Sequence, residues 1–241
     1  GRDKSNINIY PSASLTKNIE GINMTEFGLL QRKGIVGFTD GYKSIQNTRL
    51  MSRIIRSAFD LNCLVMQHAE DLELSSGGMV NDGIISTKLG LQGISYLAEK
   101  VIVERDLTLL EDFNCRYHLS QISSAASLEV IKNKKQNVTF TSGVSINNLS
   151  LNENDVGDFR TFLKLSPPLR SEDDRLSLVN GIKNDLIQVI VSDHKPEDEE
   201  SKRLTFAQAA TGASGIETLL SLSLELFHNG SLKLETIIQA L

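Results

Sequence analysis

The sequence has little of several residue types that mark particular classes of protein. Its 241 residues include two cysteines, four prolines and no tryptophan, and only 5% of them are aromatic. Two cysteines are too few for the disulfide framework of a small secreted domain. Both Cys63 and Cys115 lie in apolar, strand-like runs, as reduced core cysteines do. We therefore expect a cytoplasmic protein.

Long apolar runs and clusters of positive charge are missing as well. No run approaches the roughly 20 apolar residues that cross a bilayer, and no signal-peptide pattern is present. The net charge is -5, and no run of lysine and arginine extends beyond a few residues. A mildly negative net charge without basic clusters provides no positively charged surface for binding nucleic acid. We expect neither a membrane nor a nucleic acid as partner.

Short apolar runs alternate with longer amphipathic ones, which is typical of βαβ units and a parallel sheet. No glycine-rich phosphate loop follows the first predicted strand, so a closed barrel is favoured over a doubly wound open sheet. We expect one domain over 1–241. The predicted strands are 6–10, 34–39, 62–67, 115–122, 137–141 and 186–192, and the predicted helices are 46–60, 95–112, 124–134, 172–183 and 213–228.

Polar residues follow three of the predicted strands at the point where each strand ends. Asp40 follows the second strand, His68 the third and Asp193 the sixth. In a parallel barrel these ends meet at one face, where the active site lies. An aspartate there can also cap the next helix, and a single histidine can be structural. Three such residues at equivalent positions favour a divalent-metal site, with Asp193 as a base for metal-bound water.

Four segments in order resemble the signatures of dihydroorotase, in the amidohydrolase superfamily. They are Gly37-Phe38-Thr39-Asp40-Gly41, the segment at His68, Lys164-Leu165-Ser166-Pro167-Pro168-Leu169-Arg170, and Ser192-Asp193-His194 with Pro196. The resemblance implies a (β/α)8 TIM-type barrel that is incomplete here, with about six βα units corresponding to strands three to eight. The first two strands, the first of which ends in the family's His-x-His, and a small β-domain would then be absent, and we expect a chain truncated at both ends.

The resemblance also assigns roles within a zinc site. It makes Asp40 and His68 metal ligands, and Asp193 both a ligand and the acid/base. The family's remaining imidazole falls at Gln121, whose amide is a poor donor for Zn²⁺. We therefore expect this chain by itself to hold little or no zinc and to be inactive.

Substrate contacts carry over less completely. Ser166 stands where the family has asparagine, and Glu197 stands where it has histidine. A carboxylate at Glu197 would repel an anionic substrate, whereas Arg170, after the Pro-Pro turn, could receive a substrate carboxylate or pair with a neighbouring aspartate.

Three functions are compatible with these residues. The first is a dihydroorotase of pyrimidine biosynthesis that interconverts carbamoyl aspartate and dihydroorotate at a metal-bound hydroxide. The second is a non-catalytic subunit of an aspartate carbamoyltransferase assembly, which Gln121, Ser166 and Glu197 favour. The third is a related cyclic amidohydrolase such as a hydantoinase. Exposed sheet edges would also favour a homo-oligomer.

Overall fold

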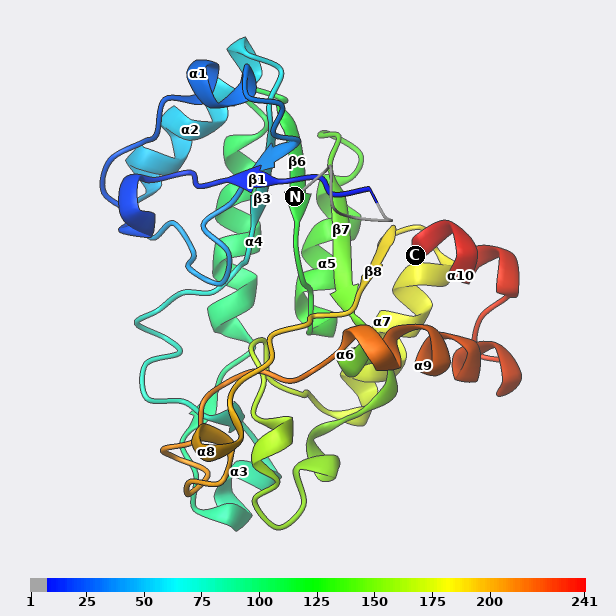
Figure 1. Ribbon diagram of the computed structural model, residues 1–241. Coiled ribbons are helices and arrows are strands. Elements are labelled where there is room, and N and C mark those ends of the chain that lie inside the picture. The colour runs from blue at the N-terminus through cyan, green and yellow to red at the C-terminus, as the bar shows by residue number, and fades with distance from the viewer. Residues whose placement is uncertain (1–7) are drawn as a thin grey trace.

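The computed structural model describes residues 8–241, and its centre is a parallel sheet with helices packed against it (Figure 1). Six strands hydrogen-bond in the order of the chain, and every pair is parallel. This order confirms the prediction of βα units in an incomplete barrel. The strands are β1 (Ser12–Ala13), β2 (Gly37–Phe38), β3 (Leu64–Gln67), β6 (Arg116–Leu119), β7 (Thr141–Ser145) and β8 (Val189–Val191).

The helices lie close to the ranges that the sequence predicts. Capping residues set where two of them begin. The Asn47 side chain caps α2 by accepting a hydrogen bond from the Leu50 amide, and the Ser171 side chain caps α7 by accepting one from the Asp174 amide. The helices are α1 (Phe27–Gln31), α2 (Thr48–Asp60), α3 (Ile84–Leu89), α4 (Leu97–Leu109), α5 (Ala125–Lys134), α6 (Ile146–Ser150), α7 (Glu172–Lys183), α8 (Glu199–Lys202), α9 (Ile216–His228) and α10 (Leu234–Ala240), with 3-10 turns η2 (Lys17–Ile19), η3 (Glu153–Val156) and η4 (Thr161–Leu163).

Two predicted strands are wrong in their positions. Residues 8–10 of the predicted strand 6–10 are irregular, residues 6 and 7 lie outside the described part, and the first strand is β1. The strand predicted at 137–141 instead occupies Thr141–Ser145. Its small polar residues have low strand propensity, and the ladder with β8 (Gly143 opposite Val189) determines its position. Gly143 is required there, because a Cβ atom would lie 2.7 Å from the Ser120 carbonyl oxygen.

The two faces of the sheet differ in burial. Side chains on the helix side, such as Val65, Leu119 and Ile190, are almost fully buried. Their neighbours on the other side, such as Met66 and Val191, are only half-buried. A closed barrel would cover that second face as its interior, so its exposure is a consequence of the open sheet.

A second, smaller core lies beyond the carboxyl ends of the strands. It consists of Val80, Val156, Leu165, Leu169 and Phe206. Around it are α3, α8 and a two-stranded parallel sheet of β4 (Val80–Asn81) and β5 (Gly93–Ile94), which the sequence did not predict. Figure 1 shows α3 and α8 together at one end of the molecule.

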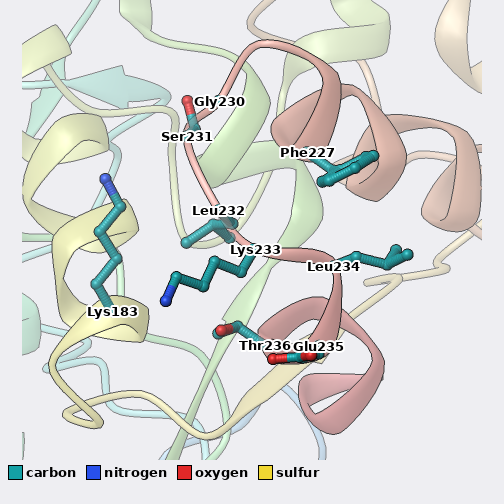
Figure 2. Close-up of a pocket in the computed structure, with 9 residues that line it drawn as sticks. All are labelled: Lys183, Phe227, Gly230, Ser231, Leu232, Lys233, Leu234, Glu235 and Thr236. Carbon is teal, nitrogen blue, oxygen red and sulfur yellow. The ribbon is translucent and has the colours of Figure 1, made fainter.

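At the amino end of the sheet, a pocket lies between α7 and the turn that joins α9 to α10 (Figure 2). Lys183 and Lys233 line it together with Phe227. Because α7 ends at Lys183, before β8 begins, this pocket is separate from the carboxyl ends of the strands. None of the described helices is long and apolar enough to cross a membrane.

Candidate functional site

The ends of β2, β3 and β8 place the three predicted site residues at the same end of the sheet. Asp40 lies two residues beyond β2, His68 follows β3 directly, and Asp193 lies two residues beyond β8. Their exposed fractions are 4%, 2% and 9%. Burial of so many polar groups at a strand end is costly unless each is hydrogen-bonded.

Asp193 is held by two donors on one carboxylate oxygen. The Tyr42 hydroxyl donates to Oδ1 at 2.8 Å, and the Gln121 amide donates to the same atom at 2.6 Å. Burial raises the pKa of the Asp193 carboxyl, and these two hydrogen bonds oppose the rise. The backbone of Asp193 has a φ of 50°, a left-handed conformation that costs a non-glycine residue about 1–2 kcal/mol. Strain of this kind gathers at functional sites.

Tyr42 links Asp193 to His68. Its ring packs edge-on against the imidazole, with centroids 5.8 Å apart. Desolvation by burial and the charge of Asp193 raise the pKa of the Tyr42 hydroxyl, so that it stays a hydrogen-bond donor at neutral pH. Sequence reasoning missed Tyr42. Its position two residues after Asp40, in the loop at a strand end, is the signal that could have identified it.

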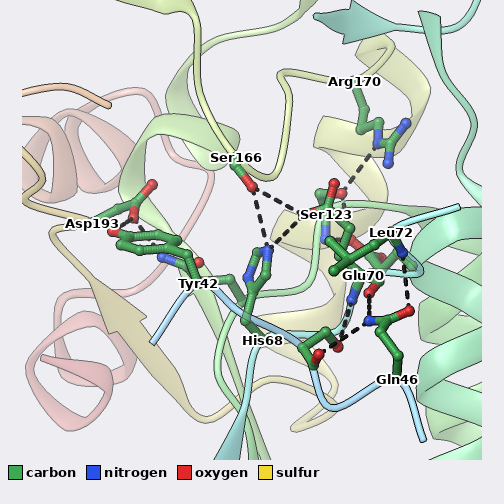
Figure 3. A network of polar contacts seen from close by, with 12 residues as sticks. Tyr42, Gln46, His68, Glu70, Leu72, Ser123, Ser166, Arg170 and Asp193 are labelled. Atoms are coloured by element: carbon green, nitrogen blue, oxygen red, sulfur yellow. Dashed lines mark hydrogen bonds and ion pairs between the residues drawn. The ribbon is translucent and has the colours of Figure 1, made fainter. Parts of the chain in front are cut away.

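His68 contacts a carboxylate and a hydroxyl through Nε2 (Figure 3). The Oε2 atom of Glu70 and the Oγ atom of Ser166 each lie 3.3 Å from Nε2, whereas Nδ1 is buried without a hydrogen-bond partner. Burial tends to raise the pKa of Glu70, but the hydrogen bond and charge of His68 bring that pKa below its usual value. Ser166, which the sequence named as a substrate contact, therefore lies beside His68, and Glu70 is a neighbour that the sequence did not single out.

Asp40 is fully engaged by a single residue. The Thr16 amide donates to Oδ1 at 3.0 Å, and the Thr16 hydroxyl donates to Oδ2. Thr16 itself is completely buried. The contact joins the loop after β1 to the loop after β2, and it places one hydrogen bond on each Asp40 oxygen.

Arg170 and Glu197 lie in different surroundings. Arg170 is 3% exposed, and it donates to the Ser123 hydroxyl, the Asn81 side chain and the Ile94 carbonyl at 3.1, 2.9 and 2.5 Å. These bonds attach the small β4–β5 sheet to the strand ends. Glu197 is half-buried and pairs with Lys195 at 3.7 Å. Contact of either residue with a substrate stays a prediction.

Amidohydrolases of the dihydroorotase and hydantoinase type are metal-dependent, so the donor set can be tested against a metal. Each Asp40 oxygen accepts one hydrogen bond, Asp193 accepts two on Oδ1, and Gln121 presents an amide N–H in place of a donor nitrogen. Over residues 8–241, no group of three or more histidine, cysteine, aspartate or glutamate side chains is arranged to hold a metal ion. As arranged, these residues do not fit a divalent ion such as Zn²⁺, which prefers nitrogen and sulfur donors.

The architecture is similar to that of solved cyclic-amide hydrolases. L-Hydantoinase (dihydropyrimidinase) from Arthrobacter aurescens superposes with a TM-score of 0.78 and 20% identity, over 95% of this chain and 53% of that one. Dihydroorotase from Saccharomyces cerevisiae superposes with a TM-score of 0.70 and 17% identity, over 95% of this chain and 64% of that one. At such identities the likeness establishes the barrel fold alone.

Sequence comparison gives the family. The dihydroorotase of Ehrlichia canis (strain Jake) is 41% identical over 98% of this chain, and that of Syntrophus aciditrophicus (strain SB) is 39% identical over 97%. The chain spans about half the length of these curated relatives, 53% and 55% respectively. A family model described as dihydro-orotase-like matches residues 1–127. The chain therefore belongs to the dihydro-orotase-like family.

Proposed function

We propose that the protein containing this chain is a dihydroorotase-like cyclic amidohydrolase of pyrimidine biosynthesis, which interconverts carbamoyl aspartate and dihydroorotate. The observation that carries the proposal is the Asp193 carboxylate, which is buried at a strand end and fixed by Tyr42 and Gln121 beside His68. The curated dihydroorotases at 39–41% identity support the same reaction.

The chemistry needs a group that can both accept and donate a proton. In ring closure, the ureido nitrogen forms a bond to the side-chain carboxyl carbon of carbamoyl aspartate, and a C–O bond of that carboxyl breaks to release water. One proton leaves the nitrogen, and the departing carboxylate oxygen gains two protons, one that replaces the nitrogen's and one from solvent, to leave as water. Asp193 is suited to both transfers, because burial brings its pKa closer to neutrality. His68 and Ser166 would orient the substrate beside it, as a histidine–hydroxyl pair at 3.3 Å can do.

The test uses the complete natural protein and follows dihydroorotate in both directions. We expect Asp193→Asn to lower kcat/KM by about 10²–10⁴-fold, the usual contribution of general acid–base catalysis. Asp158→Asn makes the same chemical change at an exposed position and is the control. An Asp193→Asn enzyme with the control's rate would refute the role of Asp193.

The poor fit of the donor set to a metal favours a second candidate, a non-catalytic dihydroorotase-like subunit in an aspartate carbamoyltransferase assembly. A carboxylate that is held by an amide and a hydroxyl, with no fitting metal donor set, is compatible with a retained structural role. For this candidate, the complete protein would show no turnover, yet it would elute together with aspartate carbamoyltransferase in size-exclusion chromatography. Turnover that Asp193→Asn abolishes would reject this candidate.

We further propose that residues 1–241 form part of a single barrel domain that two more strands and a small β-domain complete. Within the described residues, β1 and β8 are each paired on one side only, which supports missing neighbours or association with other copies. Light scattering of the 241-residue chain should then report a dimer or larger species. Cys63 and Cys115 are free and buried, which suits a cytoplasmic protein.

A further inference from the structure

Hydrogen bonds compete with a metal at Asp193 and Asp40, because two donors reach Oδ1 of Asp193 and Thr16 donates to both oxygens of Asp40. The two donors to Asp193 come from chain segments far apart: Tyr42 is 151 residues away and Gln121 is 72 residues away. Each of these bonds brings a positive hydrogen to Oδ1. A cation at the same oxygen would be repelled by those hydrogens, so that the two donors compete with a metal for Oδ1.

Gln121 cannot bind the metal in the orientation it takes here. It is 8% exposed, and its Nε2 is committed to Asp193. An amide nitrogen has no lone pair for a metal, and rotation of the side chain would present an oxygen, which Zn²⁺ accepts less readily than imidazole. Rotation would also turn the amide oxygen towards the Asp193 carboxylate, which is repulsive.

We propose that Tyr42 and Gln121 replace the metal at Asp193, and that Gln121 is the residue that excludes zinc. Asp193, Tyr42 and Gln121 then form a hydrogen-bonded site that assembles without a divalent ion. This inference concerns metal content and assembly, so it can succeed or fail independently of the proposed reaction.

The experiment compares zinc binding by the 241-residue chain and its variants. After dialysis, the unaltered chain should carry well under one zinc per chain, and EDTA should leave its thermal midpoint unchanged. Gln121→His supplies an imidazole and removes the competing amide donor, so we expect its zinc dissociation constant to fall at least tenfold, on the order of the effects seen when metal-site contacts change. Gln239→His adds a histidine on the exposed face of α10 and is the matched control.

Tyr42→Phe gives an independent readout, since it removes one donor from Asp193 and keeps the ring that packs on His68. We expect it to tighten zinc binding in the Gln121→His background. Circular dichroism checks that each variant is folded, and if Gln121→His does not fold, Tyr42→Phe alone should still bind zinc more tightly than the unaltered chain. Stoichiometric zinc in the unaltered chain, or zinc binding by Gln121→His no tighter than by Gln239→His, would overturn the proposal.

Discussion

Two buried aspartates in this molecule accept a hydrogen bond from a tyrosine, but their surroundings differ. Tyr117 donates to Asp106 at 2.7 Å in the helix layer, and Tyr42 donates to Asp193 at 2.8 Å at the strand ends. Burial raises the pKa of both carboxyls. Asp106 also pairs with Arg105 at 2.7 Å, whereas Asp193 has the neutral Gln121 amide.

The difference separates a structural carboxylate from one suited to chemistry. Arg105 donates in addition to the Gln46 carbonyl at 3.0 Å, so the Asp106 network joins α4 to the loop before α2. The Arg105 guanidinium favours the ionised form of Asp106 and so opposes the rise in its pKa that burial causes. Asp193 has no guanidinium partner: its ionised form is favoured by the hydrogen bonds of Tyr42 and Gln121 and, after these, by the charge of His68.

Removal of the charge at each aspartate should give the largest contrast. Asp106→Asn leaves Arg105 partly buried without its counter-ion, and we expect it to lower the free energy of unfolding by about 3 kcal/mol. Asp193→Asn keeps an oxygen that accepts from Tyr42 and Gln121, and its cost should stay below about 1 kcal/mol. Urea unfolding of both variants measures these free energies. Equal losses would show that the two networks contribute equally to the stability of the fold.

The second prediction concerns the effect of acid on His118, which lies on the face of the sheet opposite to Tyr117. His118 follows Tyr117 in β6 and therefore points to the opposite face, where its Nδ1 lies 2.8 Å from the Thr141 hydroxyl. Burial lowers the pKa of His118 to about 4, below its usual 6.5. As pH falls, the unfolded chain therefore binds the proton before the folded chain does. The free energy of unfolding is unaffected by His118 above about pH 6.5 and decreases from there towards pH 4.

The full shift in the pKa of His118 corresponds to a change of about 3 kcal/mol in the free energy of unfolding. Because His118 is only half-buried, we expect a change of about 2 kcal/mol or less. In His118→Gln, the free energy of unfolding should therefore fall less between pH 6.5 and 4 than in the unaltered chain. His228→Asn, at an exposed position on α9, is the control and should leave that pH dependence unchanged. An unchanged slope in His118→Gln would show that folding does not lower the pKa of His118.

The smallest contrast should come from the tyrosines themselves. Tyr117→Phe removes a hydrogen bond to a carboxylate that has no access to solvent, and we expect a loss of about 1.5 kcal/mol of stability. Tyr42 is half-buried, and Tyr42→Phe should cost less than about 1 kcal/mol. Thermal unfolding followed by circular dichroism compares the pair. If Tyr42→Phe lost more stability than Tyr117→Phe, the Asp193 network and not the Asp106 network would be the one that stabilises the fold.

The sequence by itself determined the order of the main helices and of most strands in the six-stranded sheet, and the positions of the strand-end residues. Helices α2, α4, α5, α7 and α9 lie within a few residues of their predicted ranges, because capping residues and apolar periodicity are local properties. Asp40, His68 and Asp193 follow strands in the chain, and parallel strands bring such residues to one end of the sheet whatever the detailed packing.

Only the tertiary structure decided which partners these residues have. Nothing local pairs Tyr42 with Asp193 across 151 residues, or Arg170 with Asn81 across 89. The same holds for β7, whose five residues form a strand because β6 and β8 lie on either side of it. Hydrogen bonds and ladder registers depend on distances between segments that the packed sheet sets, and a residue pattern along the chain does not contain those distances.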